Sequence, residues 1–173
     1  MSPRAARTAD RQPARRERPD GQPEQHQAGL QRAVAQDVLQ PDRQRQDDPE
    51  QALREYIAGK LRFSREHPDD SRVYANEVVS GAPIFSAEIA ERVIPALQAD
   101  VAIFNRWAEQ GLCRPVDGRH LMILLWASTQ VYADWASQIS LVLGKKKLGS
   151  EDFAAAETLI VDMVLRTVLV KAN

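Results

Sequence analysis

Two segments near the C-terminus are apolar on almost every side, and they limit the folds that this chain can adopt. The first has six consecutive apolar residues at 121–126, and the second is apolar at most positions of 159–170. A helix that is apolar nearly all round must be covered on nearly all sides. A second copy of the same helix pair supplies that cover in a two-fold, four-helix interface. We therefore predict a homodimer with an interface that contains Leu121, Leu125, Leu159, Met163 and Val164; the alternative is a helix buried centrally in one subunit.

The pattern after residue 48 is helical throughout, which predicts an all-α bundle of about five helices. Helices are expected over residues 49–66, from Asp69 or Asp70 to about 79, over 86–110 and 118–143, and from a cap at Ser150 to the end. Asp48 and Pro49 suit the cap and first position of the first helix. Pro95 should kink the third helix, and Gly111 should end it. We find no strand pattern and no internal repeat.

Composition changes sharply near residue 48. The preceding segment is rich in Arg, Gln, Pro and Asp, and it contains no Ile, Phe, Tyr, Trp or Lys. Such a segment buries too little apolar surface to offset the entropy of ordering it. We therefore expect residues 1–47 to be disordered and residues 48–173 to form the folded domain. Acidic residues nearly balance the arginines before position 48, so a nucleic-acid-binding arm is not favoured over a plain tail.

Charge and reactive residues exclude several function classes. The net charge is -1, with one cysteine, Cys113, and three scattered histidines. This set predicts no disulfide, no metal site and no cofactor. No nucleophile lies near a base in any known motif, so we predict no catalytic residues and no enzyme; the alternative is an enzyme that uses Glu77 in a pocket. No apolar run approaches the ~20 residues of a membrane span, and we expect a cytoplasmic protein without membrane contact.

Polar residues inside the apolar helices are candidate ligand contacts. Gln130 follows Trp126 by four residues, which places both side chains on one helix face. A buried amide costs free energy unless it is paired, so Gln130 either bonds to protein or meets a ligand. Glu77 raises the same question in a Val-rich helix. An aromatic plate beside an amide suits a small planar polar molecule, whereas a satisfied core network is the alternative.

From about Asp48 onward the chain resembles the C-terminal domain of TetR-family regulators, and within them the RutR-type pyrimidine-utilisation regulators. The resemblance is carried by the blocks REYIAGKLRFSREHPDDSR (54–72), NEVVSGAP (76–83) and RPVDGRHLMILLWASTQVYADWASQI (114–139). It implies an all-helical homodimer built on the last two helices, with a ligand pocket in the domain core. The implied ligand is a pyrimidine such as uracil or thymine, contacted by Trp126 and Gln130, with Glu77 and Trp107 completing the pocket.

The chain departs from this family before Asp48. A three-helix headpiece with a helix-turn-helix is expected there, but the sequence lacks its apolar period, so no DNA-binding residues are predicted. The Arg, Gln, Pro and Ala bias is typical of a GC-rich region read out of frame. We predict a ligand-responsive regulator of pyrimidine or related nitrogen-compound catabolism that keeps sensing and dimerisation. DNA binding would then require an intact headpiece. The alternative is a dimerisation module that modulates intact paralogues.

Overall fold

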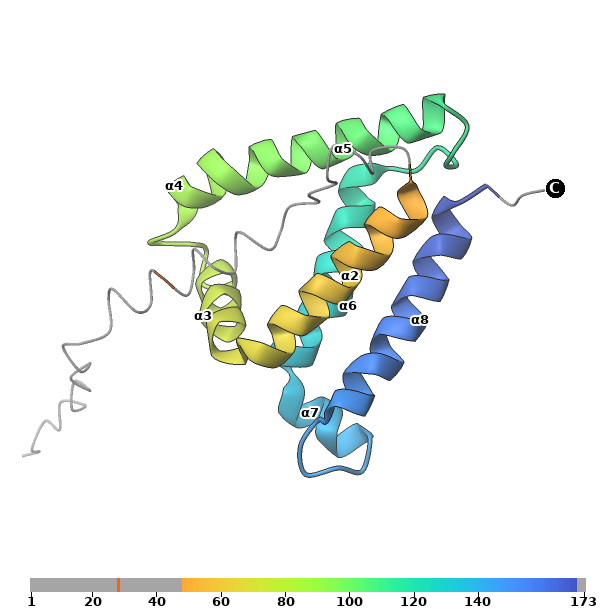
Figure 1. The fold of residues 1–173 in the computed structure, drawn as a ribbon. Helices are drawn as coiled ribbons and strands as arrows, with labels where there is room; N and C mark the ends of the chain where they lie inside the picture. Colours follow the sequence, from red (N-terminus) through yellow and green to blue (C-terminus); the bar gives the residue numbers. More distant parts are fainter. Residues whose placement is uncertain (1–27, 29–47, 171–173) are drawn as a thin grey trace, which may run out of the picture.

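The computed structural model describes residue 28 and residues 48–170, and every regular element in the latter range is helical (Figure 1). This confirms the predicted all-α class. The expectation that residues 1–47 are disordered falls on residues outside the described range, Ala28 apart. No helix among the described residues is both long enough and apolar enough to span a bilayer.

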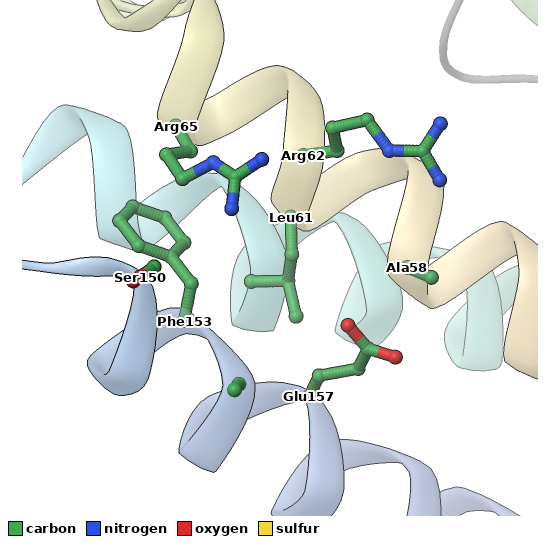
Figure 2. A pocket seen from close by; sticks show the side chains of 8 residues that line it. Ala58, Leu61, Arg62, Arg65, Ser150, Phe153 and Glu157 are labelled. Carbon is green, nitrogen blue, oxygen red and sulfur yellow. The ribbon is translucent and has the colours of Figure 1, made fainter.

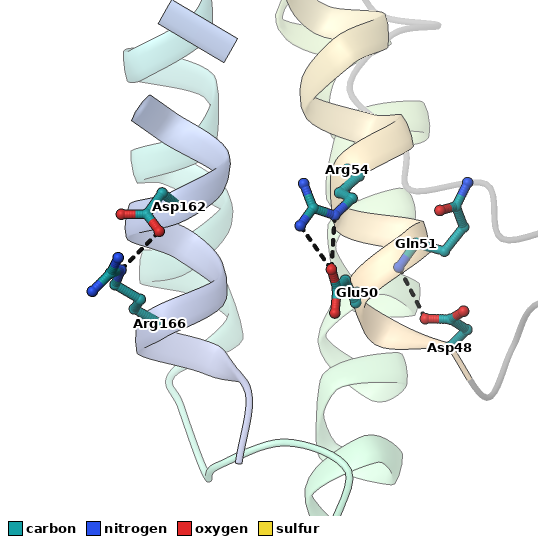
Figure 3. Close-up of polar contacts among 6 residues, drawn as sticks. All are labelled: Asp48, Glu50, Gln51, Arg54, Asp162 and Arg166. Carbon is teal, nitrogen blue, oxygen red and sulfur yellow. Dashed lines mark hydrogen bonds and ion pairs between the residues drawn. The ribbon is translucent and has the colours of Figure 1, made fainter. Parts of the chain in front are cut away.

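The first helix of the domain, α2 (Pro49–Glu66), begins and ends as the sequence predicts. The Asp48 carboxylate accepts a hydrogen bond from the Gln51 backbone N–H at 3.0 Å, and Pro49 occupies the first turn (Figure 3). These contacts satisfy a donor that the helix start would otherwise leave unpaired. The chain turns at His67, where Pro68 starts the next helix. Pro disfavours helical geometry in the residue before it, which is the reason for the break.

Helix α2 packs against both α6 (Gly118–Asp134) and α8 (Ser150–Val168), and these three helices enclose the main core (Figure 1). Leu53, Ile57 and Leu61 recur along its inner face and are almost completely buried. The same core contains residues from both neighbouring helices, including Met122, Leu125, Phe153, Ile160 and Val161. Burial of side chains of this size stabilises by about 1.5–3 kcal/mol each.

Helix α3 (Pro68–Val79) leads into a tight turn. It begins one to two residues earlier than predicted, because Pro68 itself takes the first helical position. Ser80 to Pro83 then form the turn, with positive φ at Gly81 (87°) and at Ala82 (53°). The left-handed region is unusual for alanine, so other contacts must hold this turn in place.

The third predicted helix is interrupted upstream of Pro95. It consists of α4 (Ser86–Glu88), the π-helical segment η2 (Ile89–Val93) and α5 (Ile94–Glu109). Proline lacks a backbone N–H and its ring crowds the preceding turn. Five residues of wider π-helical winding accommodate this misfit. Gly111, with φ of 72°, ends the helix as predicted.

The predicted helix over 118–143 is wrong in one respect, because it breaks at Trp135. Helix α6 ends at Asp134, and a separate helix α7 (Ala136–Val142) follows. The Arg72 side chain donates to the Ala133 carbonyl oxygen at 3.1 Å, and Ser71 donates to the Asp134 carboxylate at 2.7 Å. Side chains from α3 thus hold the end of α6, and they take up a carbonyl oxygen that a continuous helix would use.

A charged clamp fixes the start of α8. Gly149, rather than the predicted Ser150, is the residue before the helix, and its N–H donates to the Asp152 carboxylate at 2.8 Å. Lys145 donates to the same carboxylate at 2.6 Å and to Glu151 at 2.7 Å. The bond from Lys145, followed by that from Gly149, lowers the pKa of Asp152. The bonds to Asp152 and Glu151 raise the pKa of Lys145.

Replacement of Asp152 by Asn should lower the melting temperature at pH 7, because it removes the negative charge that pairs with Lys145 and leaves one acceptor oxygen where Lys145 and Gly149 use two. A carboxylate with a lowered folded-state pKa stabilises above its unfolded pKa of about 3.9. That stabilisation is lost as pH falls through the folded-state pKa. Thermal melts from pH 7 to pH 2 should therefore show the gap between the two proteins closing below about pH 4.

Asp162→Asn is the matched control for this titration. Asp162 pairs with Arg166 on the exposed side of α8 at 2.7 Å (Figure 3). Exposed pairs contribute little, so this variant should melt close to the parent protein at every pH. Equal losses in both variants, or a gap for Asp152→Asn that persists at pH 2, would contradict a clamp at Gly149.

Candidate functional site

Trp126 lies where two apolar clusters meet. The half-buried Trp126 side chain packs against the main core and also against a smaller cluster around Phe85 and Val93. Its indole Nε1–H donates to the Tyr56 hydroxyl oxygen at 2.8 Å. The bond joins α6 to α2 and fixes the orientation of the ring. An immobilised aromatic face of this kind can bind a planar molecule without a further entropic cost of ordering.

The smaller cluster forms a wall beside Trp126. Phe85 and Val93 are buried in it, and Val73, Tyr74 and Ile89 pack against them. These residues come from α3, the turn before α4, and η2. Ile89 and Val93 belong to η2, the π-helical segment upstream of Pro95. Part of the wall is therefore formed by residues whose backbone departs from a regular α-helix. π-Helical segments occur frequently at functional sites.

Gln130 lies one turn after Trp126 on α6 and is half-buried. Within residues 48–170 its side chain forms no hydrogen bond that meets standard geometry. A side-chain amide offers two donors and one acceptor oxygen. The amide of Gln130 is therefore available to a ligand that has both donors and acceptors on one edge.

Glu77 is engaged by the neighbouring turn. Its side chain is only 7% exposed, and one carboxylate oxygen accepts from the backbone N–H groups of Ile84 at 2.6 Å and Phe85 at 3.0 Å. The Glu77 carbonyl also accepts from Ala82 at 2.8 Å. These bonds hold the strained turn and place Phe85 in the small cluster against which Trp126 packs. Glu77 therefore supports the predicted ligand site indirectly, by holding the backbone at Phe85.

Trp107, on α5, is completely buried in the main core. It meets Phe104 edge to face, with ring centroids 5.4 Å apart. Its carbonyl oxygen accepts from Leu112 and Cys113, which fold the chain back after α5. The structure therefore places Trp107 within the main core, against which the half-buried Trp126 side chain also packs.

Sequence reasoning assigned Tyr56 to the apolar face of α2 and missed its contact with Trp126. The periodicity signal was correct, since Tyr56 is buried. A buried tyrosine hydroxyl usually finds a partner, and this rule could have flagged Tyr56. Nothing in the spacing of residues 56 and 126 could have identified that partner.

The predicted dimer residues divide into two groups. Leu159 and Met163 are each 60% exposed on α8, four residues apart and on one face. Val164 is half-buried. Leu121 and Leu125 are only 8% and 1% exposed because they are buried in the main core of the subunit, so they contribute little to its outer surface. Ile123 and Leu124 are instead the exposed large apolar residues of α6.

The described part of the chain contains no cluster of metal-ligating side chains, and its one cysteine is buried. Burial raises the pKa of Cys113 to about 11, which keeps the thiol protonated at neutral pH. No group of three or more His, Cys, Asp or Glu side chains between residues 48 and 170 is placed to hold a metal ion. The observed arrangement is therefore one of apolar walls with a few polar groups.

Comparison with known proteins agrees with this architecture. The model of the YcdC-like protein, C-terminal region, a TetR-type C-terminal family, matches residues 33–171. That range includes residues 33–47, which we had assigned by composition to the segment before the folded domain. The HTH-type transcriptional regulator RutR of Escherichia coli K12 is 38% identical over 96 residues, and the RutR proteins of Shigella flexneri and Escherichia coli O157:H7 match equally. The alignment covers 56% of this chain and 45% of each relative, so it spans about half of their length.

Replacement of Glu77 by Ala should destabilise the domain by about 2–3 kcal/mol, because it leaves the N–H groups of Ile84 and Phe85 without their acceptor. Glu77→Gln keeps an acceptor oxygen and should cost about 1 kcal/mol. Urea unfolding followed by circular dichroism measures both.

Glu109→Ala serves as the control, because Glu109 is exposed at the end of α5; surface changes of this kind stay within about 0.5 kcal/mol. If Glu77→Ala unfolded at the same urea concentration as Glu109→Ala, Glu77 would not be what holds the turn.

Proposed function

The chain belongs to the TetR family, with a RutR-like C-terminal domain, and on that premise we propose that it is a ligand-responsive transcriptional regulator. In this proposal the described helices bind a small planar ligand and form a homodimer. The ligand is a pyrimidine such as uracil or thymine, and the regulated genes serve catabolism of pyrimidines or related nitrogen compounds. We place the protein in the cytoplasm, as an effector-binding protein without catalytic activity.

The observation that carries the ligand proposal is the pair of Trp126 and Gln130. Tyr56 fixes the indole of Trp126, and the amide of Gln130 lies one helical turn away without a partner in residues 48–170. A pyrimidine offers a flat face for the indole and alternating N–H and C=O groups for the amide. Pockets for small molecules combine apolar walls with a few placed polar groups in this way.

The dimer proposal depends on the outer face of α8. Ala155, Leu159 and Met163 follow one another at intervals of four residues and are all exposed. Helices α6 and α7 expose further apolar residues, including Leu124, Leu141 and Val142. Monomeric proteins seldom expose contiguous apolar patches of large area. A second copy would bury this face in the two-fold arrangement that most soluble oligomers use.

In this proposal helix α6 couples ligand binding to dimerisation. Its Trp126 and Gln130 contact the ligand, and its exposed Ile123 and Leu124 lie near the partner. A ligand that prefers one position of α6 would shift the population of dimer arrangements. DNA contact is then the task of a helix-turn-helix headpiece, whose two copies are spaced by the dimer. We assign no base contact to residues 48–170.

Calorimetric titration of the full chain with uracil should show saturable binding, and Gln130→Leu should weaken it at least tenfold. The leucine keeps the volume of the side chain but leaves the edge of the base unpaired, at a cost of about 1–3 kcal/mol. Gln138→Leu, at an exposed position of α7, is the matched control and should bind as the parent does. Absence of heat at ~1 mM uracil and thymine, or equal losses in both variants, would overturn the ligand proposal.

Sedimentation velocity should give a dimer for the parent chain and a monomer for the double variant Leu159→Glu/Met163→Glu. Each change would bury a charge in an apolar interface, and we expect the dimer Kd to rise at least a hundredfold. Circular dichroism should remain unchanged, since both residues are exposed within the subunit. Val79→Glu removes an exposed apolar residue of α3 and should leave the dimer intact; a monomeric parent, or a dimeric double variant, would contradict the interface.

A further inference from the structure

A cavity of about 310 Å³ lies at the C-terminal end of α6, where α2, α3, α7 and the 145–149 loop meet. Its charged lining is entirely basic. Arg65 comes from α2, Arg72 from α3, and Lys146 and Lys147 from the loop, and no carboxylate lines the cavity. Four cations around one small cavity produce a positive potential that attracts anions.

The two lysines carry the uncompensated part of this charge. Arg65 donates to Glu66 at 2.9 Å, and Arg72 donates to Asp69 at 2.8 Å, so both guanidinium groups are partly neutralised at the rim. Each keeps further N–H donors, because a guanidinium has five. Lys146 and Lys147 form no ion pair with any residue in the range 48–170. A ligand that brings negative charge would therefore supply the counter-ion that these lysines lack.

One wall of the same cavity is aromatic. Tyr132 and Phe153 both line it, and their ring centroids lie 5.8 Å apart. The hydroxyl groups of Ser137 and Ser150 also line the cavity and make no hydrogen bond with residues 48–170. The lining thus combines an apolar surface with cations and hydroxyl donors.

We propose that this cavity binds a small organic phosphate monoester. The phosphate would lie between Lys146, Lys147 and Arg72, and the organic group would contact Tyr132 and Phe153. Charge-assisted hydrogen bonds to phosphate are about twice as strong as neutral ones. The volume of about 310 Å³ is near the lower limit for ligand pockets, which favours a compact molecule.

The adjacent pocket between α2 and α8 is a useful contrast. It shares Arg65, Ser150 and Phe153 with the basic cavity, but Glu157 also lines it, as Figure 2 shows. A carboxylate in the lining opposes an anion, so the phosphate is assigned to the basic cavity. Tyr132 follows Gln130 by two residues on α6, so the two side chains lie about 200° apart around the helix axis and on opposite sides of it. The basic cavity is therefore separate from the proposed pyrimidine site.

The test is calorimetric titration of the full chain with adenosine monophosphate, adenosine and inorganic phosphate. Saturable binding is expected for the monophosphate. Adenosine and inorganic phosphate should each bind at least tenfold more weakly. Adenosine lacks the phosphate that the cations would bind, and inorganic phosphate lacks the organic group that the aromatic wall would contact. Lys146→Gln/Lys147→Gln should weaken monophosphate binding at least tenfold, and raising the salt concentration should weaken it further.

The control is Arg114→Gln/Arg119→Gln, which removes the same charge at exposed positions near the other end of α6. It should bind the monophosphate like the parent, as should Gln130→Leu, which alters only the proposed pyrimidine site. Equal losses in the two double variants would reduce the effect to net charge and overturn the proposal. Equal affinity for adenosine and its monophosphate would overturn it as well, and so would the absence of saturable binding by any of the three compounds.

Discussion

The structure depends on the burial of one face of α2 between α6 and α8. Leu53, Ile57 and Leu61 occupy the space between these helices and are almost completely removed from solvent. Two polar contacts fix the rotation of α2 against α6: the bond from Trp126 to Tyr56, and that from Ser64 to the carbonyl oxygen of Thr129 at 3.0 Å. Because the apolar face sets the packing and the polar bonds set the register, small shifts of α2 would move Trp126.

This arrangement gives α6 two different environments. Its inner side contributes Met122 and Leu125 to the core, and its outer side exposes Leu124. Trp126 and Gln130 lie between these extremes and are half-buried. A helix that is apolar nearly all round therefore need not be buried on every side within one subunit. The part that remains exposed is where the proposed partner would contact it.

The sequence was sufficient to predict elements defined by local chemistry. Asp48 with Pro49, the break at His67, and Gly111 each act through their own backbone preferences, and all three lie where periodicity and capping rules put them. The break at Trp135 could not be predicted in this way, because it depends on Arg72, which is distant in the sequence. Long-range contacts also limited the site prediction: Tyr56 and Trp126 meet only in the folded chain.

The sequence was also insufficient to predict which residues of α6 are buried. Consecutive apolar residues 121–126 predict a helix that must be covered, but they do not indicate which side is buried in the subunit and which side stays exposed. That choice is made by packing, and it placed Leu121 and Leu125 inside the subunit. The same holds for α8, where the pattern grouped Leu159 and Met163 with Val164 as interface residues, whereas packing leaves the first two 60% exposed and Val164 half-buried.

The most direct test of the central claim follows the indole N–H signals in the nitrogen-proton spectrum of labelled protein during titration with uracil. The chain has three tryptophans, one completely buried, one half-buried against Tyr56 and one exposed. If the base binds on Trp126, its signal should shift in a saturable manner while that of the exposed Trp135 stays in place. A titration that leaves the Trp126 signal unmoved, or that moves all three alike, would contradict the account.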